Sequence, residues 1–174
     1  MPTRAAAVVT RVFFWFAACG VVAVALVFGS SGVDYRVVAL GSVLPLAENL
    51  SGSPWVLHTL AGSVVLLAAV MALTAGRGRR LRRRRWIGLP IGTLVFLVAS
   101  GAWSRTALFW WPVGGGGGVG HGSPPELDRP LAVLLVLETA GIAALLWTAH
   151  RFDLSDPQRR RVFMTTGRLT RPSA

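Results

Sequence analysis

Two ionisable side chains within apolar stretches are the first candidates for chemistry. Glu138 lies about nine residues into the apolar stretch 130–149, which places it ~13 Å below the outer end of a helix at 1.5 Å per residue. An ionisable group at that depth is costly when unpaired and usually faces a bundle interior or a cavity. Glu138 is therefore expected to be a proton relay, a coupling site or a ligand contact, or else a protonated or hydrogen-bonded packing residue. In the second case Thr139, Thr93 or a partner chain would supply its partner.

His58 enters the second apolar stretch about one turn after Pro54. An imidazole there can bind haem iron or another metal, or it can hydrogen-bond near the lipid headgroups. It would meet Glu138 if the second and fourth apolar stretches were neighbours, although the two depths differ by ~7 Å at helical rise. A haem or metal ligand would also need a second strong ligand at matching height. Both interpretations of His58 therefore stay open.

The remaining polar residues form no recognisable catalytic set. No Ser-His-Asp arrangement, carboxylate pair or metal motif can be assembled from the sequence. The single cysteine, Cys19, excludes an intrachain disulfide. Glu48, Glu126, Asp128 and Arg105 are expected at the outer surface, as a polar rim of exposed ion pairs that contribute little to stability. The sequence therefore favours a protein that is not an enzyme and holds no metal or cofactor.

The elements that would position these residues are membrane helices. Of the 174 residues, 53% are hydrophobic and only 14% are charged, against about 25% charged in soluble domains. Four apolar stretches, 5–28, 54–75, 86–105 and 130–149, are long enough to approach or cross a hydrocarbon core of ~30 Å. The predicted fold is all-α: a four-helix transmembrane bundle over residues 1–150, followed by a basic cytoplasmic tail over 151–174.

A block of arginines between the second and third stretches sets the predicted direction of the bundle. Short arginine-rich loops resist translocation, and with this loop inside, all but three of the 18 basic residues lie in the cytoplasm. Both termini are accordingly predicted inside, and the block is expected to contact anionic lipid headgroups rather than nucleic acid. The basic residues are all arginine, which is typical of a GC-rich bacterium, so the predicted location is its cell membrane. The block consists of Arg77, Arg79, Arg80, Arg82, Arg83, Arg84 and Arg85.

Two short helices are predicted outside the spans. Residues 29–53 are expected to form an outer loop, in which Val33, Val37, Leu40 and Leu44 recur at helical spacing. They indicate a helix that lies in the outer interface with its apolar side down and ends near Pro45. In the tail, the Ser-Asp-Pro-Gln sequence at 155–158 has capping-box spacing and a proline suited to a first turn. A surface helix is predicted to begin there.

Small residues within the spans indicate close helix packing. Gly62 shares a helix face with His58, and Gly88 and Gly92 form a GxxxG pair in the third span. Such faces allow transmembrane helices to approach closely. They predict association with other membrane protein chains, as a hetero- or homo-oligomer.

The order of His58, the basic block 77–85 and a following span that ends near Gly101 resembles the layout of haem-handling bundles such as the haem A synthase and cytochrome b561 families. The similarity covers only the second and third spans, and it would imply that His58 binds haem. Those families carry paired axial histidines, whereas the corresponding position of the fourth span is apolar or Glu138. The acidic residue expected just before the first ligand is also missing, so membership of these families is not claimed.

These observations lead to one favoured function and two alternatives. The favoured function is a non-catalytic accessory or assembly subunit of a larger cell-membrane complex. The first alternative is a haem-binding or redox membrane protein with His58 as a ligand. The second is a small proton-coupled carrier that uses Glu138.

Overall fold

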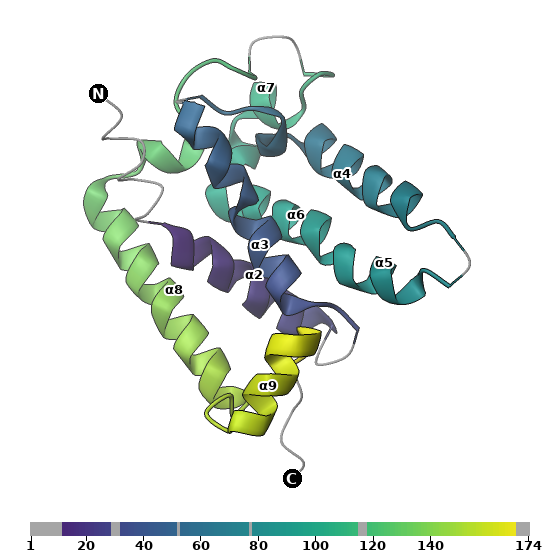
Figure 1. The fold of residues 1–174 in the computed structure, drawn as a ribbon. Coiled ribbons are helices and arrows are strands. Elements are labelled where there is room, and N and C mark those ends of the chain that lie inside the picture. Colours follow the sequence, from purple (N-terminus) through teal and green to yellow (C-terminus); the bar gives the residue numbers. More distant parts are fainter. Residues whose placement is uncertain (1–11, 29–31, 52, 77, 115–117, 170–174) are drawn as a thin grey trace.

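The computed structural model is all-helical, with no strand, within the residues that it describes, 12–28, 32–51, 53–76, 78–114 and 118–169 (Figure 1). The expected all-α class is therefore confirmed. Residues 1–11 at the start of the first predicted span, Arg77 of the block and residues 170–174 of the tail lie outside the described residues. The predictions that fall on them stay predictions.

The helices follow one another along the chain with short 3₁₀ turns between them. The α-helices are α2 (Phe13–Phe28), α3 (Tyr35–Val43), α4 (Leu60–Leu73), α5 (Arg80–Trp86), α6 (Gly88–Ser100), α7 (Thr106–Phe109), α8 (Leu131–Arg151) and α9 (Pro157–Thr166). The 3₁₀ turns are η1 (Leu44–Ser51), η2 (Val56–His58), η3 (Ala102–Ser104) and η4 (Pro125–Asp128). The predicted tail helix is confirmed as α9, with Asp156 as its N-cap residue.

Helix α3 lies at the centre of the structure, where it packs against both α2 and α6 (Figure 1). Glycines make this packing close. A Cβ atom on Gly92 of α6 would overlap the backbone of Val38 and Gly41 in α3, and one on Gly41 would overlap the backbone of Leu89. Without side chains at these positions the two helix backbones come into direct contact.

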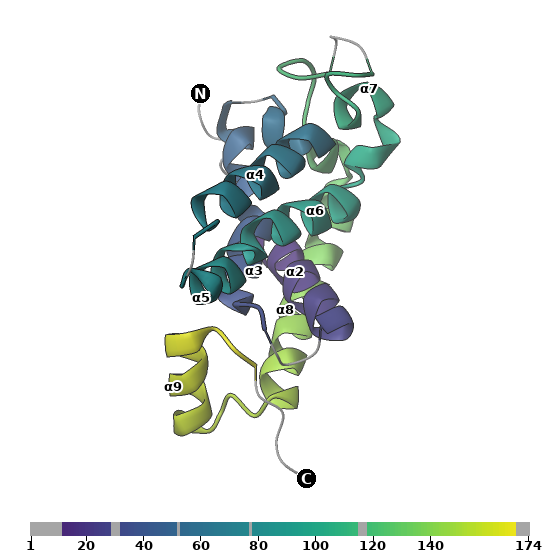
Figure 2. The same cartoon turned by 90° about the vertical axis from the view of Figure 1, so that its right-hand side faces the viewer.

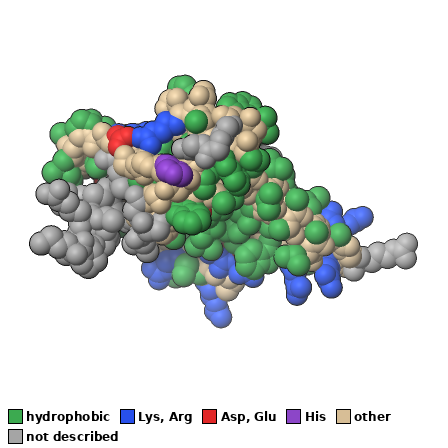
Figure 3. Space-filling view, turned by 90° about the horizontal axis from the view of Figure 1, so that it is seen from above, with side chains coloured by type: hydrophobic (Ala, Val, Ile, Leu, Met, Phe, Trp, Pro, Cys, Tyr) green, Lys and Arg blue, Asp and Glu red, His purple; other side chains and the backbone are tan. Residues whose placement is uncertain are grey.

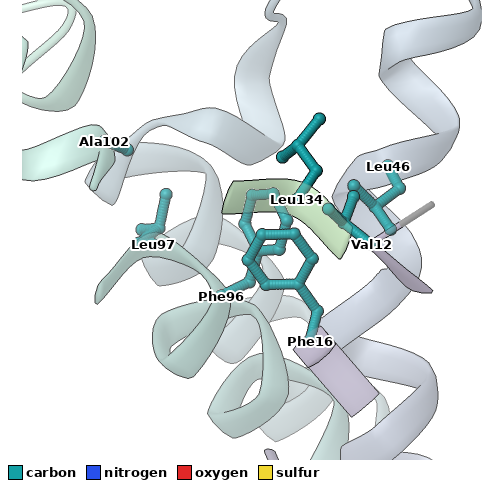
Figure 4. Close-up of a cluster of buried hydrophobic side chains, with 7 residues drawn as sticks. All are labelled: Val12, Phe16, Leu46, Phe96, Leu97, Ala102 and Leu134. Atoms are coloured by element: carbon teal, nitrogen blue, oxygen red, sulfur yellow. The ribbon is translucent and has the colours of Figure 1, made fainter. Parts of the chain in front are cut away.

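Two hydrophobic clusters lie at opposite ends of this helix packing. The first joins the start of α2 to the end of α6, and within it the rings of Phe16 and Phe96 have centroids 4.5 Å apart (Figure 4). The second joins the end of α2 to the start of α3 and to the segments around α9. The first cluster comprises Val12, Phe16, Leu46, Phe96, Leu97, Ala102 and Leu134; the second comprises Val21, Val24, Tyr35, Val38, Phe152 and Leu169.

One end of the molecule, which we name the arginine end, brings together α5, the start of α3 and α9. The Asp34 carboxylate lies 3.3 Å from Nε of Arg85, and the amide of Tyr35 donates to the carbonyl of Gly167 at 2.9 Å. In Figures 1 and 2, α9 lies beside the lower end of α8, below α3. Residues 32–34, which lead into α3, are therefore at the same end as the described arginines of the block.

This geometry contradicts the prediction that residues 29–53 form an outer loop opposite the arginines. The described part of that segment starts at the arginine end, and α3 then continues through η1 to the opposite end, where Glu48 and Asn49 lie near His58. The ends of α2 are likewise placed differently from the prediction, which put the start of the first span on the side of the arginines. The start of α2 lies in the first cluster, away from the arginines, and its end lies in the second.

The helix predicted within residues 33–44 is present as α3, but its predicted place in the membrane interface is wrong. Its residues Tyr35, Val37, Val38, Gly41 and Ser42 are buried, whereas an interfacial helix would leave its polar side open to water. The physical reason is the matching set of small residues: Gly20 of α2 faces Ser42, and Gly88 of α6 faces Val38. Helical periodicity alone cannot reveal such partners.

One helix in the described part of the chain, α8, is long and apolar enough to cross a membrane, with 21 residues and a mean hydropathy of 2.0. It matches the fourth predicted span closely. The apolar helices α2 and α4 are shorter, because the predicted first span begins in residues that are not described and because η2 occupies the start of the second. Helix length by itself therefore supports one crossing helix.

Replacing Gly92 by leucine should destabilise this fold. The new side chain would overlap the α3 backbone, and overpacking of this kind costs ~2 kcal/mol or more. The measurement is the thermal unfolding midpoint in detergent, followed by circular dichroism. Ala68→Leu, a similar enlargement at an exposed position of α4, is the matched control. An unchanged midpoint in Gly92→Leu would contradict the close packing of α3 on α6.

Candidate functional site

The end of the molecule opposite the arginines, which we name the histidine end, holds a buried polar network. Its residues come from three separate turns: Glu48 and Asn49 from η1, His58 from η2 and Glu126 from η4. His58 is fixed in the connection just before α4, because the next residue, Thr59, caps that helix by accepting a hydrogen bond from the amide of Gly62 at 2.9 Å. Local capping thus fixes the backbone next to the imidazole.

Both ring nitrogens of His58 contact carboxylates. Nδ1 lies 2.9 Å from Oε2 of Glu48, and Nε2 lies 3.0 Å from Oε1 of Glu126. Carboxylates only accept hydrogen bonds, so an imidazole that satisfies two of them must donate from both nitrogens and carry a positive charge. His58 and Glu126 are both fully buried. The arrangement is therefore a buried imidazolium held between two acids.

Further contacts fix each member of the network. Glu48 accepts hydrogen bonds from the amides of Trp55 and Leu57, at 3.2 and 3.0 Å. The side-chain amide of Asn49 donates to Oε1 of Glu126 at 2.7 Å. The ring of Phe96 meets the imidazole edge to face at 5.3 Å, which ties the network to the first hydrophobic cluster.

The network controls the protonation of its members. Burial tends to lower the pKa of His58, but the hydrogen bonds and charges of Glu126 and Glu48 outweigh it and raise that pKa to about 9. For Glu126, burial tends to raise the pKa, and the hydrogen bonds from His58 and Asn49 together with the imidazolium charge lower it overall. At neutral pH His58 is therefore positively charged and Glu126 is negatively charged.

Two acceptor atoms of the network, Oε2 of Glu126 and Oδ1 of Asn49, are buried and have no hydrogen-bond partner among the described residues. A buried acceptor without a donor is costly. These two atoms therefore make the network a favourable place for one small hydrogen-bond donor.

The two carboxylate contacts of His58 oppose its use as a haem or metal ligand. A ligating imidazole must offer the lone pair of one nitrogen, and here both nitrogens are occupied by carboxylates. Binding iron would therefore require one of these hydrogen bonds to break. Within the described ranges, no group of three or more His, Cys, Asp or Glu residues is placed to hold a metal ion.

Glu138 is not part of this network. Its carboxylate accepts hydrogen bonds from the amides of Phe14 and Trp15, at 3.2 and 3.1 Å. Those amides belong to the first turn of α2, where a helix has unpaired N–H groups and the positive end of its dipole. Glu138 of α8 thus caps α2, and Gly141, one turn later, lets the two backbones approach. The expected partners are not used: Thr139 and Thr93 each donate to a carbonyl of their own helix.

The predicted outer rim divides into two kinds of residue. Arg105 forms an ion pair with Asp128, as predicted. Glu48 and Glu126 instead turn inward to His58, which the sequence reasoning missed. Glu48 and Glu126 lie on separate connections, so no motif spacing predicted that they would meet. Each lies beside an apolar segment that contains proline, and this was the one indication in the sequence that they could be buried.

The predicted packing glycines and block arginines have mixed roles. Gly88 and Gly92 pack against α3 within this chain, and Gly62 packs against the backbone of Val56 in the preceding turn. Arg79 and Arg83 donate to the carbonyls of Leu73 and Thr74 at 3.0 Å each, so they cap the end of α4. Arg80, Arg82, Arg84 and Arg85 are exposed, and Arg85 also pairs with Asp34.

The stability of the protein should fall as the pH rises past neutrality. Because the pKa of His58 is raised from 6.5 to about 9, its contribution is complete below pH 6.5 and is lost as the pH passes through 9, on the order of 3 kcal/mol in all. Unfolding midpoints measured from pH 6 to 10 should show this loss in the natural chain, and His58→Gln should remove it. The exposed His121 provides the control, since His121→Gln should keep the natural pH profile. An unaltered profile in His58→Gln would exclude a buried imidazolium.

Comparison of the chain with protein-family models, with curated proteins and with solved structures finds no match. Its function is therefore inferred from the geometry described above.

Proposed function

We propose that this chain is a multi-pass integral protein of the cell membrane that works by binding rather than by catalysis, as an accessory or assembly subunit of a larger membrane complex. The observation that carries the proposal is the combination of a broad exposed apolar surface with arginines gathered at one end. The arginine end would face the cytoplasm and the histidine end the outside.

The exposed surface of α8 is the clearest support for a membrane environment. Only 17% of its most apolar window is buried, so it is not the core helix of a soluble protein. Leu135, Val136, Leu146 and Trp147 are 52%, 68%, 66% and 56% exposed. Helix α4 adds further exposed residues, including Val65 and Leu73. Two separate helices thus each expose several large apolar side chains, as expected of surfaces that face lipid.

The distribution of charge supports the direction. Figure 3 shows hydrophobic side chains over the middle of the view from above, and most of the arginines visible there project from its lower and right margins. Arg36, Arg84, Arg85 and Arg168 line one cavity at the arginine end, as expected for a cytoplasmic face. Trp103 and Trp110, which are 60% and 52% exposed, suit the opposite membrane interface.

The geometry favours five crossing segments over the four of the sequence prediction. Helices α5 and α6 are joined by Ile87, whose backbone is helical, so they form one rod of roughly 30 Å. Helix α3 continues through η1 in the same way for roughly 25 Å. Together with α2, α4 and α8 these give five segments between the two ends. The start of α2 would then face outward and the tail inward.

A binding role is supported by the way in which the candidate chemical groups are used. His58 is held between two carboxylates, and Glu138 is occupied by two backbone amides. Both are therefore engaged in holding helices and turns together. The haem alternative would need His58 released from a carboxylate, and the carrier alternative would need Glu138 released from α2, so the accessory role requires the least rearrangement.

Cysteine labelling tests the proposed topology. In a Cys19→Ala background, Val33→Cys should resist a membrane-impermeant maleimide in intact cells, because residue 33 would face the cytoplasm. Arg84→Cys should be equally protected, and Trp103→Cys should be labelled, so these two variants serve as references for the inside and the outside. Labelling of Val33→Cys to the extent of Trp103→Cys would favour the four-segment arrangement and overturn the one proposed here.

Native mass spectrometry tests the accessory role. The protein, gently extracted from its own membrane, should carry a companion chain in fixed stoichiometry. The control is to dilute the extracted sample before measurement. A specific complex should persist on dilution, whereas chance association in detergent should not. A bare monomer or homodimer would contradict the accessory role, and added mass equal to that of haem would favour the redox alternative.

A further inference from the structure

A cavity of about 400 Å³ opens at the arginine end, and three segments that are distant in sequence line it. The start of α3 contributes Asp34 and Arg36, and α5 contributes Arg84 and Arg85. Thr165, at the end of α9, and Arg168, just after that helix, complete the lining. We name it the arginine pocket. In Figures 1 and 2 the start of α3, α5 and one end of α9 lie near one another.

The fold holds the walls of this pocket in fixed positions. The Tyr35 amide donates to the Gly167 carbonyl at 2.9 Å, and the Arg36 guanidinium donates to the carbonyl of Met164. Leu169 is buried in the second hydrophobic cluster. The segment after α9 is thereby attached to the start of α3, so Arg168 is held opposite the arginines of α5.

The charges in the pocket are unequal, with four arginines against one acid. Asp34 is buried, 2.8 Å from Nη2 of Arg36 and 3.3 Å from Nε of Arg85. Burial tends to raise the pKa of Asp34, but the hydrogen bonds and charge of Arg36 lower it, so the carboxylate is ionised at neutral pH. It offsets one positive charge and leaves three in excess.

Three of the guanidinium groups keep donors for a ligand. Arg85 contacts Asp34 through Nε, so its two terminal nitrogens are available to a ligand. Arg84 and Arg168 are exposed, and no ion-pair partner for either occurs among the described residues. Guanidinium groups match phosphate oxygens in charge and in their paired N–H geometry.

We propose that the arginine pocket binds the phosphoryl group of a phosphate ester, through Arg84, Arg85 and Arg168. The excess of three positive charges suits a phosphate better than a single carboxylate. The volume of about 400 Å³ leaves room for the group esterified to it. An anionic lipid headgroup and a soluble phosphate ester share this chemistry. The pocket is separate from the proposed accessory role and does not depend on a partner chain.

The test uses the purified full chain with two probes. Inorganic phosphate is titrated in detergent by calorimetry at constant ionic strength, with chloride as the reference. Retention of phosphatidylglycerol, compared with phosphatidylcholine, is measured from nanodiscs that contain both lipids. The variant Arg84→Gln/Arg168→Gln should weaken binding to the responding probe by about tenfold or more. Arg168→Lys, which keeps the charge and loses the paired N–H geometry, should weaken it less.

The matched control is Arg160→Gln/Arg161→Gln, which removes the same charge from exposed positions of α9 outside the pocket. It should bind as the natural chain does. Pocket-dependent retention of phosphatidylglycerol supports a lipid headgroup as the source, and pocket-dependent phosphate binding without it supports a soluble ester. The proposal is overturned if neither probe responds to the pocket arginines, or if the control pair weakens binding equally.

Discussion

The close contact between α3 and α6 is the constraint on which the rest of the structure depends. Two helices approach most closely where small residues let their backbones touch. Gly41, Gly88 and Gly92 provide that contact. With α3 held against α6, its start reaches the arginine end and η1 reaches the histidine end. Both polar assemblies of the molecule are therefore positioned by one helix pair.

The acidic residues show how a mostly apolar chain accommodates charge. The sequence has seven Asp and Glu residues, and each contacts a donor. Glu138 is paired with the start of a helix, Glu48 and Glu126 with an imidazolium, and Asp34 with two arginines. Asp128, Asp153 and Asp156 face Arg105 or Arg159. The contacts of Glu48, Glu126 and Glu138, and that of Asp34 with Arg85, join segments that are distant in sequence, whereas the pairs of Asp153 and Asp156 with Arg159 are local.

The sequence predicts which segments are helical better than it predicts where they lie. Periodicity located α3, capping chemistry located α9, and hydropathy located α8 within about two residues at each end. The position of α3 could not be predicted, because a helix with one apolar side suits an interface and a packed bundle equally well. To choose the packed bundle over the interface, one must know that the glycines of α6 face α3. Arg36 was assigned outside for that reason, although it lies with the block. The depth of Glu138 was recognised, but its role as a cap depends on where α2 begins in space.

The attachment of the tail to the start of α3 has a consequence for biosynthesis. The amide of Tyr35 finds its acceptor in Gly167, a residue that leaves the ribosome long after α3 has been made. Until then, Asp34 and Arg36 have only each other and the arginines of α5 as partners. The arginine end therefore reaches its final form only after Gly167 has been made, and a chain truncated before that residue would present an unfinished surface for quality-control proteases to recognise.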